Sequence, residues 1–292
     1  MNADTVLWAE LRDLGVTDVE ELSPDDIVAL ALRYAVWVPV STYVRAPWLA
    51  PYAVRKIRIR ADPRAPGPKR DLWGLPDKHG YFTDDNSLIK GVFRNRLVSP
   101  GSSPYGASKI RQGLVCCHVW AGTTAEPLLF SFIPNLVWLP KTLAPFSDAH
   151  RAAPAHLLHP TLKRVSVARY RSTVPLVAAT RVRSAWQQLD TDVDGSDDVP
   201  EQHEFVVGDG LVNLVNTRLD KLTAFLEATL DDTAPLPARF SKRYHAGVGA
   251  RIDKTVWPVQ RAVSLESRRR LREEMNVCRT SEASSDDHLS SS

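Results

Sequence analysis

Residues 113–140, GLVCCHVWAGTTAEPLLFSFIPNLVWLP, hold the strongest strand signals in the chain. Residues 113–120 are rich in β-branched and aromatic side chains, which is typical of a strand. A connection follows, and residues 128–133 and 136–139 are two short apolar segments. Pro140 favours the first position of a helix, which we expect to continue through Leu143 until Pro145 interrupts it. The order of strand, loop, apolar strand and short helix predicts an α+β fold.

On the N-terminal side, residues 1–45 predict an acidic helical cap made of two short helices. Apolar residues from Val6 to Leu14 recur at helical spacing, and Gly15 ends that pattern. Ser23 and Pro24 are typical of the N-cap and first position of a second helix. Eight acidic residues within positions 1–37 put negative charge on the outside of this cap.

Residues 46–160 predict a basic α+β core. Residues 54–70 hold seven basic residues and one acidic residue, and Arg58 and Arg60 alternate with Ile57 and Ile59 as in a strand with one basic face. Such a face can neutralise phosphates, although charge runs also serve as ordinary solvated surface. The residues expected to contact nucleic acid are Arg55, Lys56, Arg58, Arg60, Lys69 and Arg70.

Residues 161–279 predict a mainly helical C-terminal part, and the Ser- and Asp-rich residues 280–292 predict a disordered tail. Within the helical part, Asp190 to Glu201 match the EF-hand formula for a calcium loop. Asp197 stands where an apolar residue normally pairs two hands, and Pro200 directly precedes the glutamate. These departures favour an ordinary acidic surface loop.

Composition excludes several classes of protein. The chain of 292 residues has three cysteines, two of them adjacent, which excludes a disulfide framework and suits a reducing compartment. No Cys-x-x-Cys pair is present, which argues against a thiolate zinc site. The first residues are acidic rather than apolar, and the longest apolar stretches are too short to span a bilayer. We therefore expect a cytoplasmic protein with no membrane partner.

Cys117-His118-Val119-Trp120 followed by Pro134-Asn135-Leu136 resembles the HNH, or ββα-metal, nuclease motif. The resemblance implies that His118 is the general base and that Asn135 orients its ring through its backbone or side chain. It also implies one divalent cation, Mg²⁺ or Mn²⁺ with Zn²⁺ as an alternative. Cys117, Asp148 and His150 are the candidate ligands. The family often has Asp at the position of Cys117, and its helix histidine falls on Ala144.

Asp84, Asp85 and Lys90 form a possible additional site, because carboxylates can hold Mg²⁺ and a lysine can polarise water. The alternative is a simple Asp-Asp-Asn turn between strands.

Together these features predict a metal-dependent DNA endonuclease of restriction or phage-defence type, which could act as a homodimer. The alternative is a non-catalytic nucleic-acid-binding protein that keeps the basic surface and a degenerate nuclease-like motif.

Overall fold

The computed structural model describes residues 1–51, 53–55, 82–84, 89, 96–98, 103–106, 108–147, 157–189, 191, 202–207, 210–217 and 219–220. Its strands are β1 Val36–Trp37, β2 Ala53–Arg55, β3 Phe82–Asp84, β4 Arg96–Val98, β5 Lys109–Ile110, β6 Leu114–His118, β7 Leu136–Pro140 and β8 His203–Val206. Its α-helices are α1 Ala3–Asp13, α2 Pro24–Tyr34, α3 Val40–Arg45, α5 His159–Tyr170 and α6 Ala179–Gln188. Its 3₁₀ turns are η1 Val19–Glu21, η2 Thr123–Ala125, η3 Ile133–Asn135 and η4 Ala144–Ser147.

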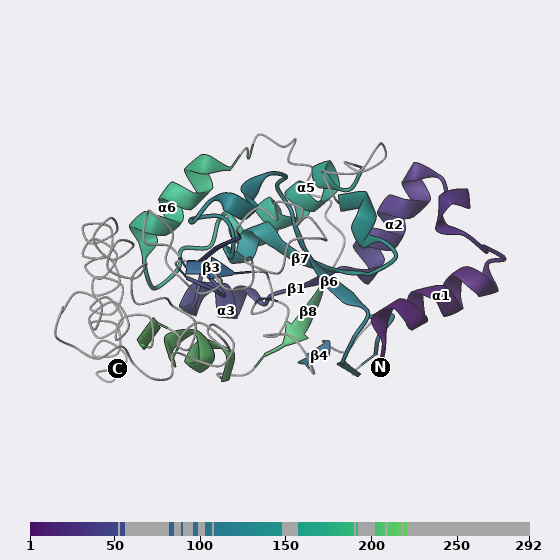
Figure 1. Ribbon diagram of the computed structural model, residues 1–292, viewed down its shortest axis with the longest axis horizontal. Coiled ribbons are helices and arrows are strands. Elements are labelled where there is room, and N and C mark those ends of the chain that lie inside the picture. The colour runs from purple at the N-terminus through teal and green to yellow at the C-terminus, as the bar shows by residue number, and fades with distance from the viewer. Residues whose placement is uncertain are drawn as a thin grey trace, which may run out of the picture.

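A mixed six-stranded sheet in the order β5-β4-β8-β1-β7-β6 forms the centre of the molecule (Figure 1). Only the β1–β8 pair is parallel; the other neighbours in this sheet run antiparallel. All five residues of β7 are buried, as expected for a central strand covered on both faces. A separate parallel pair, β2 and β3, lies beside η2 in the connection between β6 and β7.

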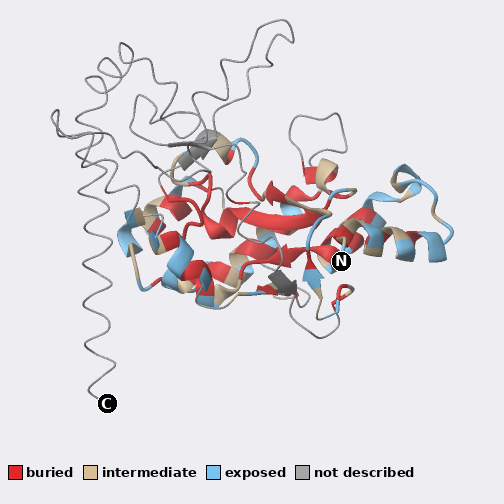
Figure 2. Ribbon diagram, turned by 60° about the horizontal axis from the view of Figure 1, so that its bottom comes forward, coloured by how far each residue is buried: buried red, intermediate tan, exposed pale blue. Residues whose placement is uncertain are grey.

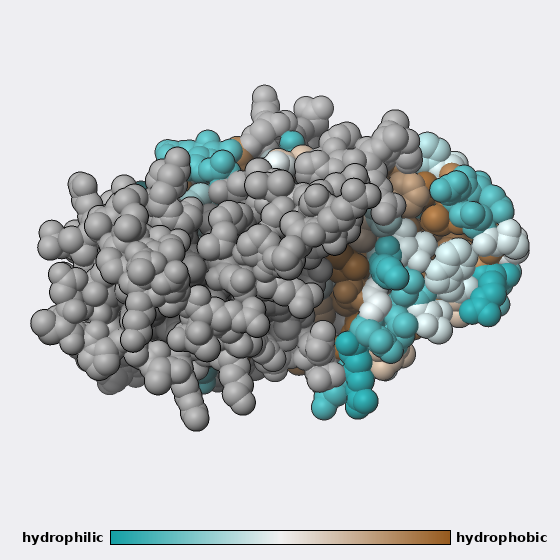
Figure 3. All heavy atoms as spheres, in the orientation of Figure 1, coloured by the Kyte–Doolittle hydropathy of each residue, from teal (hydrophilic) through white to brown (hydrophobic). Residues whose placement is uncertain are grey.

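Helices α1 and α2 pack against β7 and form one end of the molecule (Figure 1). The Ser23 hydroxyl accepts from the Asp26 amide, and the Asp26 carboxylate accepts from the Ser23 amide, so a capping box starts α2. The central strands β1 and β7 are buried, whereas the outward faces of these helices are exposed (Figure 2). This end of the molecule is correspondingly rich in hydrophilic residues (Figure 3).

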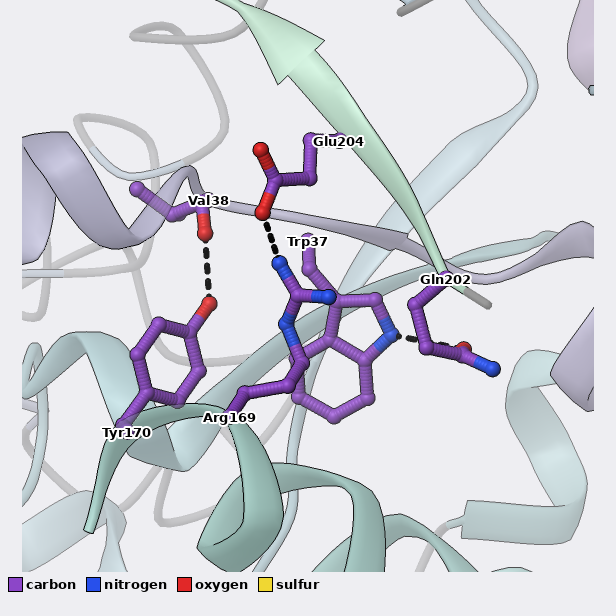
Figure 4. Close-up of polar contacts among 6 residues, drawn as sticks. All are labelled: Trp37, Val38, Arg169, Tyr170, Gln202 and Glu204. Carbon is purple, nitrogen blue, oxygen red and sulfur yellow. Dashed lines mark hydrogen bonds and ion pairs between the residues drawn. The ribbon is translucent and has the colours of Figure 1, made fainter. Parts of the chain in front are cut away.

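Buried and partly buried polar contacts attach α5 to β8 and to the residue after β1 (Figure 4). The Tyr170 hydroxyl donates to the Val38 carbonyl at 2.5 Å, and Arg169 forms an ion pair with Glu204 of β8. Beside them, the Trp37 indole donates to the side chain of Gln202 at 3.1 Å. Helix α5 is therefore held to strands that lie far apart in the sequence.

The start of α1 packs closely against Gly113, the residue that precedes β6. Gly113 has φ +89°, and a Cβ there would lie 1.9 Å from Asn2 Oδ1 and 2.6 Å from the Asp4 amide nitrogen. The Ala3 amide donates to the Gln112 carbonyl at 3.0 Å across this contact. Only glycine leaves room for such a close approach with a left-handed backbone.

The structure confirms a mixed α+β fold, the two N-terminal helices and the strand pair at residues 114–140. The helix expected from Pro140 is wrong: Pro140 is the last residue of β7, paired with Leu114, and only the 3₁₀ turn η4 follows. The described residues between 157 and 220 form the helices α5 and α6 and the strand β8, and the rest of the part expected to be mainly helical, up to residue 279, lies outside them. The basic strand expected at residues 57–60 and the disordered tail expected at residues 280–292 lie outside the described residues.

Candidate active site at the loop between β6 and β7

His118 is the last residue of β6 and is paired in register with Leu136, the first residue of β7. Its half-buried ring stacks on Phe130, with centroids 5.9 Å apart and planes 24° apart. Its Nε2 lies 2.9 Å from the Phe130 carbonyl oxygen. A carbonyl can only accept, so Nε2 carries the hydrogen, and the lone pair of the neutral imidazole is then at Nδ1.

Asn135 is completely buried and fixes both ends of the loop that separates His118 from β7. Its Oδ1 accepts from the Trp120 amide at 3.0 Å, and its Nδ2 donates to Thr123 Oγ1 at 2.8 Å and to the Leu129 carbonyl at 2.9 Å. Its backbone carbonyl accepts from the amide of Val119 at 3.0 Å. Its side-chain amide is therefore bonded to the loop rather than to the His118 ring.

These bonds link Asn135 to His118 through the backbone. Val119 directly follows His118, and Leu129 directly precedes Phe130, whose carbonyl holds the imidazole. The Phe130 amide in turn donates to the Glu126 carbonyl at 2.8 Å. The loop thus presents one carbonyl at a fixed place, and that carbonyl sets the ring orientation of His118.

Cys117 does not lie with His118, because successive side chains of a strand point to opposite faces. Its side chain is packed in the hydrophobic core, with Sγ 3.7 Å from the Val115 carbonyl oxygen. Asp148 and His150, the other proposed ligands, lie outside the described residues. Among the residues that are described, no three His, Cys, Asp or Glu side chains form a group that could hold a metal ion. The described part of the site therefore does not fit a metal centre by itself.

The two-stranded sheet brings a second set of predicted residues near this loop. Arg55 of β2 and Asp84 of β3 are paired in register, and β2 lies against η2, which begins five residues after His118. The backbones of these two residues are thus placed close to the β6–β7 loop. The remaining predicted residues, Lys56, Arg58, Arg60, Lys69, Arg70, Asp85 and Lys90, lie outside the described part of the chain. So does the acidic loop from Asp190 to Glu201, apart from Thr191 and its bond to Arg171.

Trp186 of α6 supports the same loop and was not singled out as a site residue from the sequence. Its ring meets Trp120 edge-on at 6.3 Å and Phe132 at 5.6 Å, and its Nε1 donates to the Tyr43 hydroxyl at 3.1 Å. The wall behind the loop is therefore aromatic. The sequence around Trp186 has one unusual feature, which is that residues 157–189 contain no acidic residue; it marks the segment as basic but does not single out Trp186.

Comparisons with protein-family models, with curated proteins and with solved structures find no match. Within the described ranges, no helix is both long enough and apolar enough to cross a membrane.

Proposed function

We propose that this chain is a nuclease that hydrolyses phosphodiester bonds in DNA, with His118 as the general base. The observation that supports this most directly is the held imidazole at the end of β6. Nε2–H donates to the Phe130 carbonyl, and the opposite ring nitrogen is the basic one. A histidine oriented in this way can accept a proton from an attacking water near neutral pH.

The loop geometry supports the same proposal. The antiparallel pair β6–β7 carries His118 at the end of its first strand, and Asn135 stands immediately before its second strand. Asn135 bonds to the backbone on both sides of the loop, which is the orienting role that the nuclease resemblance assigns to it. The basic segment that begins at Arg55, close to this loop, would contact the phosphates.

A divalent ion, Mg²⁺, Mn²⁺ or Zn²⁺, would stabilise the negative charge that develops on the phosphate. Asp148 and His150 remain the proposed ligands in this hypothesis, together with Asp84 from the neighbouring strand. Cys117 is a poor candidate because its thiol is buried on the other face of β6. The setting proposed for this activity is restriction or phage defence in the cytoplasm.

The test is nicking of supercoiled plasmid with Mg²⁺ or Mn²⁺ by the wild type and by His118→Gln. Glutamine can still donate to the Phe130 carbonyl but cannot act as a base. We expect its rate to fall by about 10²- to 10⁴-fold. Cys117→Ser is the matched control: it changes the adjacent residue on the opposite face, and we expect it to cleave like the wild type. Equal cleavage by the wild type and His118→Gln would remove His118 from the mechanism.

A second candidate function is nucleic-acid binding without catalysis. It is favoured by the packing of Cys117 into the core and by the lack of a metal-ligand group among the described residues. A folded wild type that binds DNA but yields no nicked product with any of the three metals would support this candidate.

A further inference from the structure

Among the described residues, the segment formed by α5, α6 and their connection carries charges of one sign only. Residues 157–189 contain six basic residues and no acidic residue. Three of the basic residues, Arg164, Arg171 and Arg183, are exposed and form no ion pair with any described residue. The six are Lys163, Arg164, Arg169, Arg171, Arg181 and Arg183.

The three exposed arginines lie around a common surface. Arg164 and Arg171 are seven residues apart and therefore share one face of the helical segment formed by α5 and its C-cap. Arg171 also lines a pocket of about 320 Å³, and Arg183 of α6 lines the same pocket. Both helices lie along the upper edge of Figure 1.

The pocket beside Arg171 and Arg183 has an apolar interior. Val182 and Trp186 line it from α6, and Val174, 75% exposed, lines it from the connection between the two helices. The Arg171 guanidinium lies 5.4 Å from the centre of the Trp186 ring and donates to Thr191 Oγ1 at 2.7 Å. The volume falls in the range of about 300–1,000 Å³ that is typical of small-ligand pockets.

We infer that this surface holds single-stranded nucleic acid, with one base in the pocket and the flanking phosphates on Arg164, Arg171 and Arg183. Arginines beside an apolar, aromatic-lined pocket match the two halves of a nucleotide, because phosphates need cations and bases need apolar or stacking contacts. An acidic peptide would use the arginines without filling the pocket.

The surface is also connected to the candidate active site. Trp186, which lines the pocket, contacts Trp120 and Phe132 of the β6–β7 loop on its other sides. A strand held over α5 and α6 therefore lies next to the loop that orients His118. The choice of nucleic acid, rather than another polyanion, as the ligand rests on the proposed function.

The first experiment measures fluorescence anisotropy of a labelled oligothymidine of about 20 nucleotides between about 50 and 200 mM NaCl, in EDTA so that no cleavage occurs. The test variant carries Arg164→Gln, Arg171→Gln and Arg183→Gln. We expect its affinity to fall at least about tenfold at the lowest salt. The slope of log K against log[salt] should fall by about 2, because three contacts to a single strand are lost.

A charge-matched control carries Arg12→Gln, Arg111→Gln and Lys141→Gln, three exposed cations outside the segment formed by α5, α6 and their connection. We expect it to bind like the wild type. Equal losses in the two triple variants, with both folded by circular dichroism, would overturn the inference in favour of a general charge effect.

A second variant tests the pocket alone. Ala179 is exposed and lines the pocket, so Ala179→Trp fills it while keeping all three arginines. We expect a roughly tenfold loss of oligothymidine affinity with an unchanged salt slope. Wild-type affinity in this variant, or tighter binding of a blunt duplex than of the single strand, would overturn the assignment of a base to the pocket. So would capture by phosphatidylserine vesicles without oligonucleotide binding.

These outcomes are independent of the cleavage test. Binding that depends on the three arginines, without nicking of plasmid, would overturn the nuclease proposal and leave this surface intact. If the triple substitution changes neither nicking nor oligothymidine binding, the proposed nucleic-acid surface is overturned and the nuclease proposal stands.

Discussion

Asn135 shows how a single buried amide can order a long loop. Its side chain makes three hydrogen bonds, to Trp120, Thr123 and Leu129, and is fully shielded from water. Removing one partner of a buried hydrogen bond leaves the other partner unsatisfied, which costs more than the bond contributes. The residue that the nuclease resemblance assigns to orientation is therefore also a large local contribution to stability.

We expect Asn135→Ala to lower the free energy of unfolding by about 3–5 kcal/mol, because three buried groups lose their partner. Urea denaturation would measure this change. Ser131→Ala is the control: the Ser131 hydroxyl is buried in the same loop and has no partner among the described residues. That substitution should be neutral or slightly stabilising. Similar losses in both variants would show that the loop responds to any change of size rather than to hydrogen bonding.

At the scale of elements, the connection between α5 and α6 contains the one described non-glycine residue with positive φ. Ala178 has φ 53° and ψ 35° and precedes the first turn of α6, where no side chain caps the helix. The left-handed conformation costs an L-residue roughly 1–2 kcal/mol. This local strain accompanies the sharp entry of the chain into α6, beside the proposed nucleic-acid surface.

We expect Ala178→Gly to stabilise the protein by about 0.5–1 kcal/mol, because relief of the left-handed strain exceeds the added entropy of the unfolded chain. Ala179→Gly, one residue later at the start of the helix, should instead cost up to about 1 kcal/mol. Thermal unfolding followed by circular dichroism would measure both. A lower melting temperature for Ala178→Gly would show that the methyl group of this half-buried residue matters more than its backbone conformation.

Local sequence patterns predict some of the helices and strands of this protein and miss others. The N-cap at Ser23 and the apolar strand after Asn135 were predictable, because caps and continuous apolar runs depend on neighbouring residues. The strand at residues 36–37 was missed, and so was β8, because strands this short have little periodicity and are defined by distant partners. The helix predicted at Pro140 failed for a similar reason. Pro140 pairs with Leu114, and the Lys141 amide then donates to the Gly113 carbonyl at 2.8 Å.

The candidate site was predictable only in part. The identities of His118 and Asn135 could be taken from the motif, but the carbonyl of Phe130 could not, because any residue supplies a carbonyl and only the loop conformation selects one. The opposite orientation of Cys117 follows from strand alternation and could have been anticipated. The pocket at Trp186 depends on how α6 packs against the loop, which no local pattern in the sequence specifies.

At the scale of the whole molecule, buried tyrosines connect separate segments of the core through hydrogen bonds. Burial raises the pKa of Tyr43 to about 12, and it also raises the pKa of Tyr34, Tyr105 and Tyr170. At Tyr34, the hydrogen bond to Glu10 raises the pKa further. The Tyr105 hydroxyl donates to the Tyr34 carbonyl at the end of α2 at 2.8 Å, and the Tyr170 hydroxyl of α5 donates to the carbonyl of Val38, the residue after β1, so both phenols hold these contacts in their neutral form.

The sign of the pH effect follows from these shifts. Each phenol keeps its proton more tightly in the folded state than in the unfolded chain, where the pKa is about 10. Their contribution is therefore fully present below about pH 10 and is lost as the pH rises through the folded pKa values. We expect stability in urea to fall above pH 10 by about 1.4 kcal/mol per pH unit for each buried tyrosine.

Tyrosinate absorbance near 295 nm, followed together with circular dichroism, would measure this loss; we expect ionisation and unfolding to coincide. Tyr43→Phe should reduce the loss of unfolding free energy per pH unit above pH 10 by the contribution of one phenol, about 1.4 kcal/mol. Ionisation of all the tyrosines near pH 10 in a protein that stays folded would contradict the prediction.

The position of β8 between β4 and β1 means that the sheet can close only late in the synthesis of the chain. Until residues 203–206 leave the ribosome, β4 and β1 each keep an unpaired edge, because β8 is the strand that joins them. At ordinary elongation rates, the interval between synthesis of β1 and of β8 is on the order of ten seconds or more. During that time the nascent chain exposes two strand edges that can pair with other chains. Closure of the sheet is thus a late step in biosynthesis, and a chain cut short before residue 203 would keep both edges open.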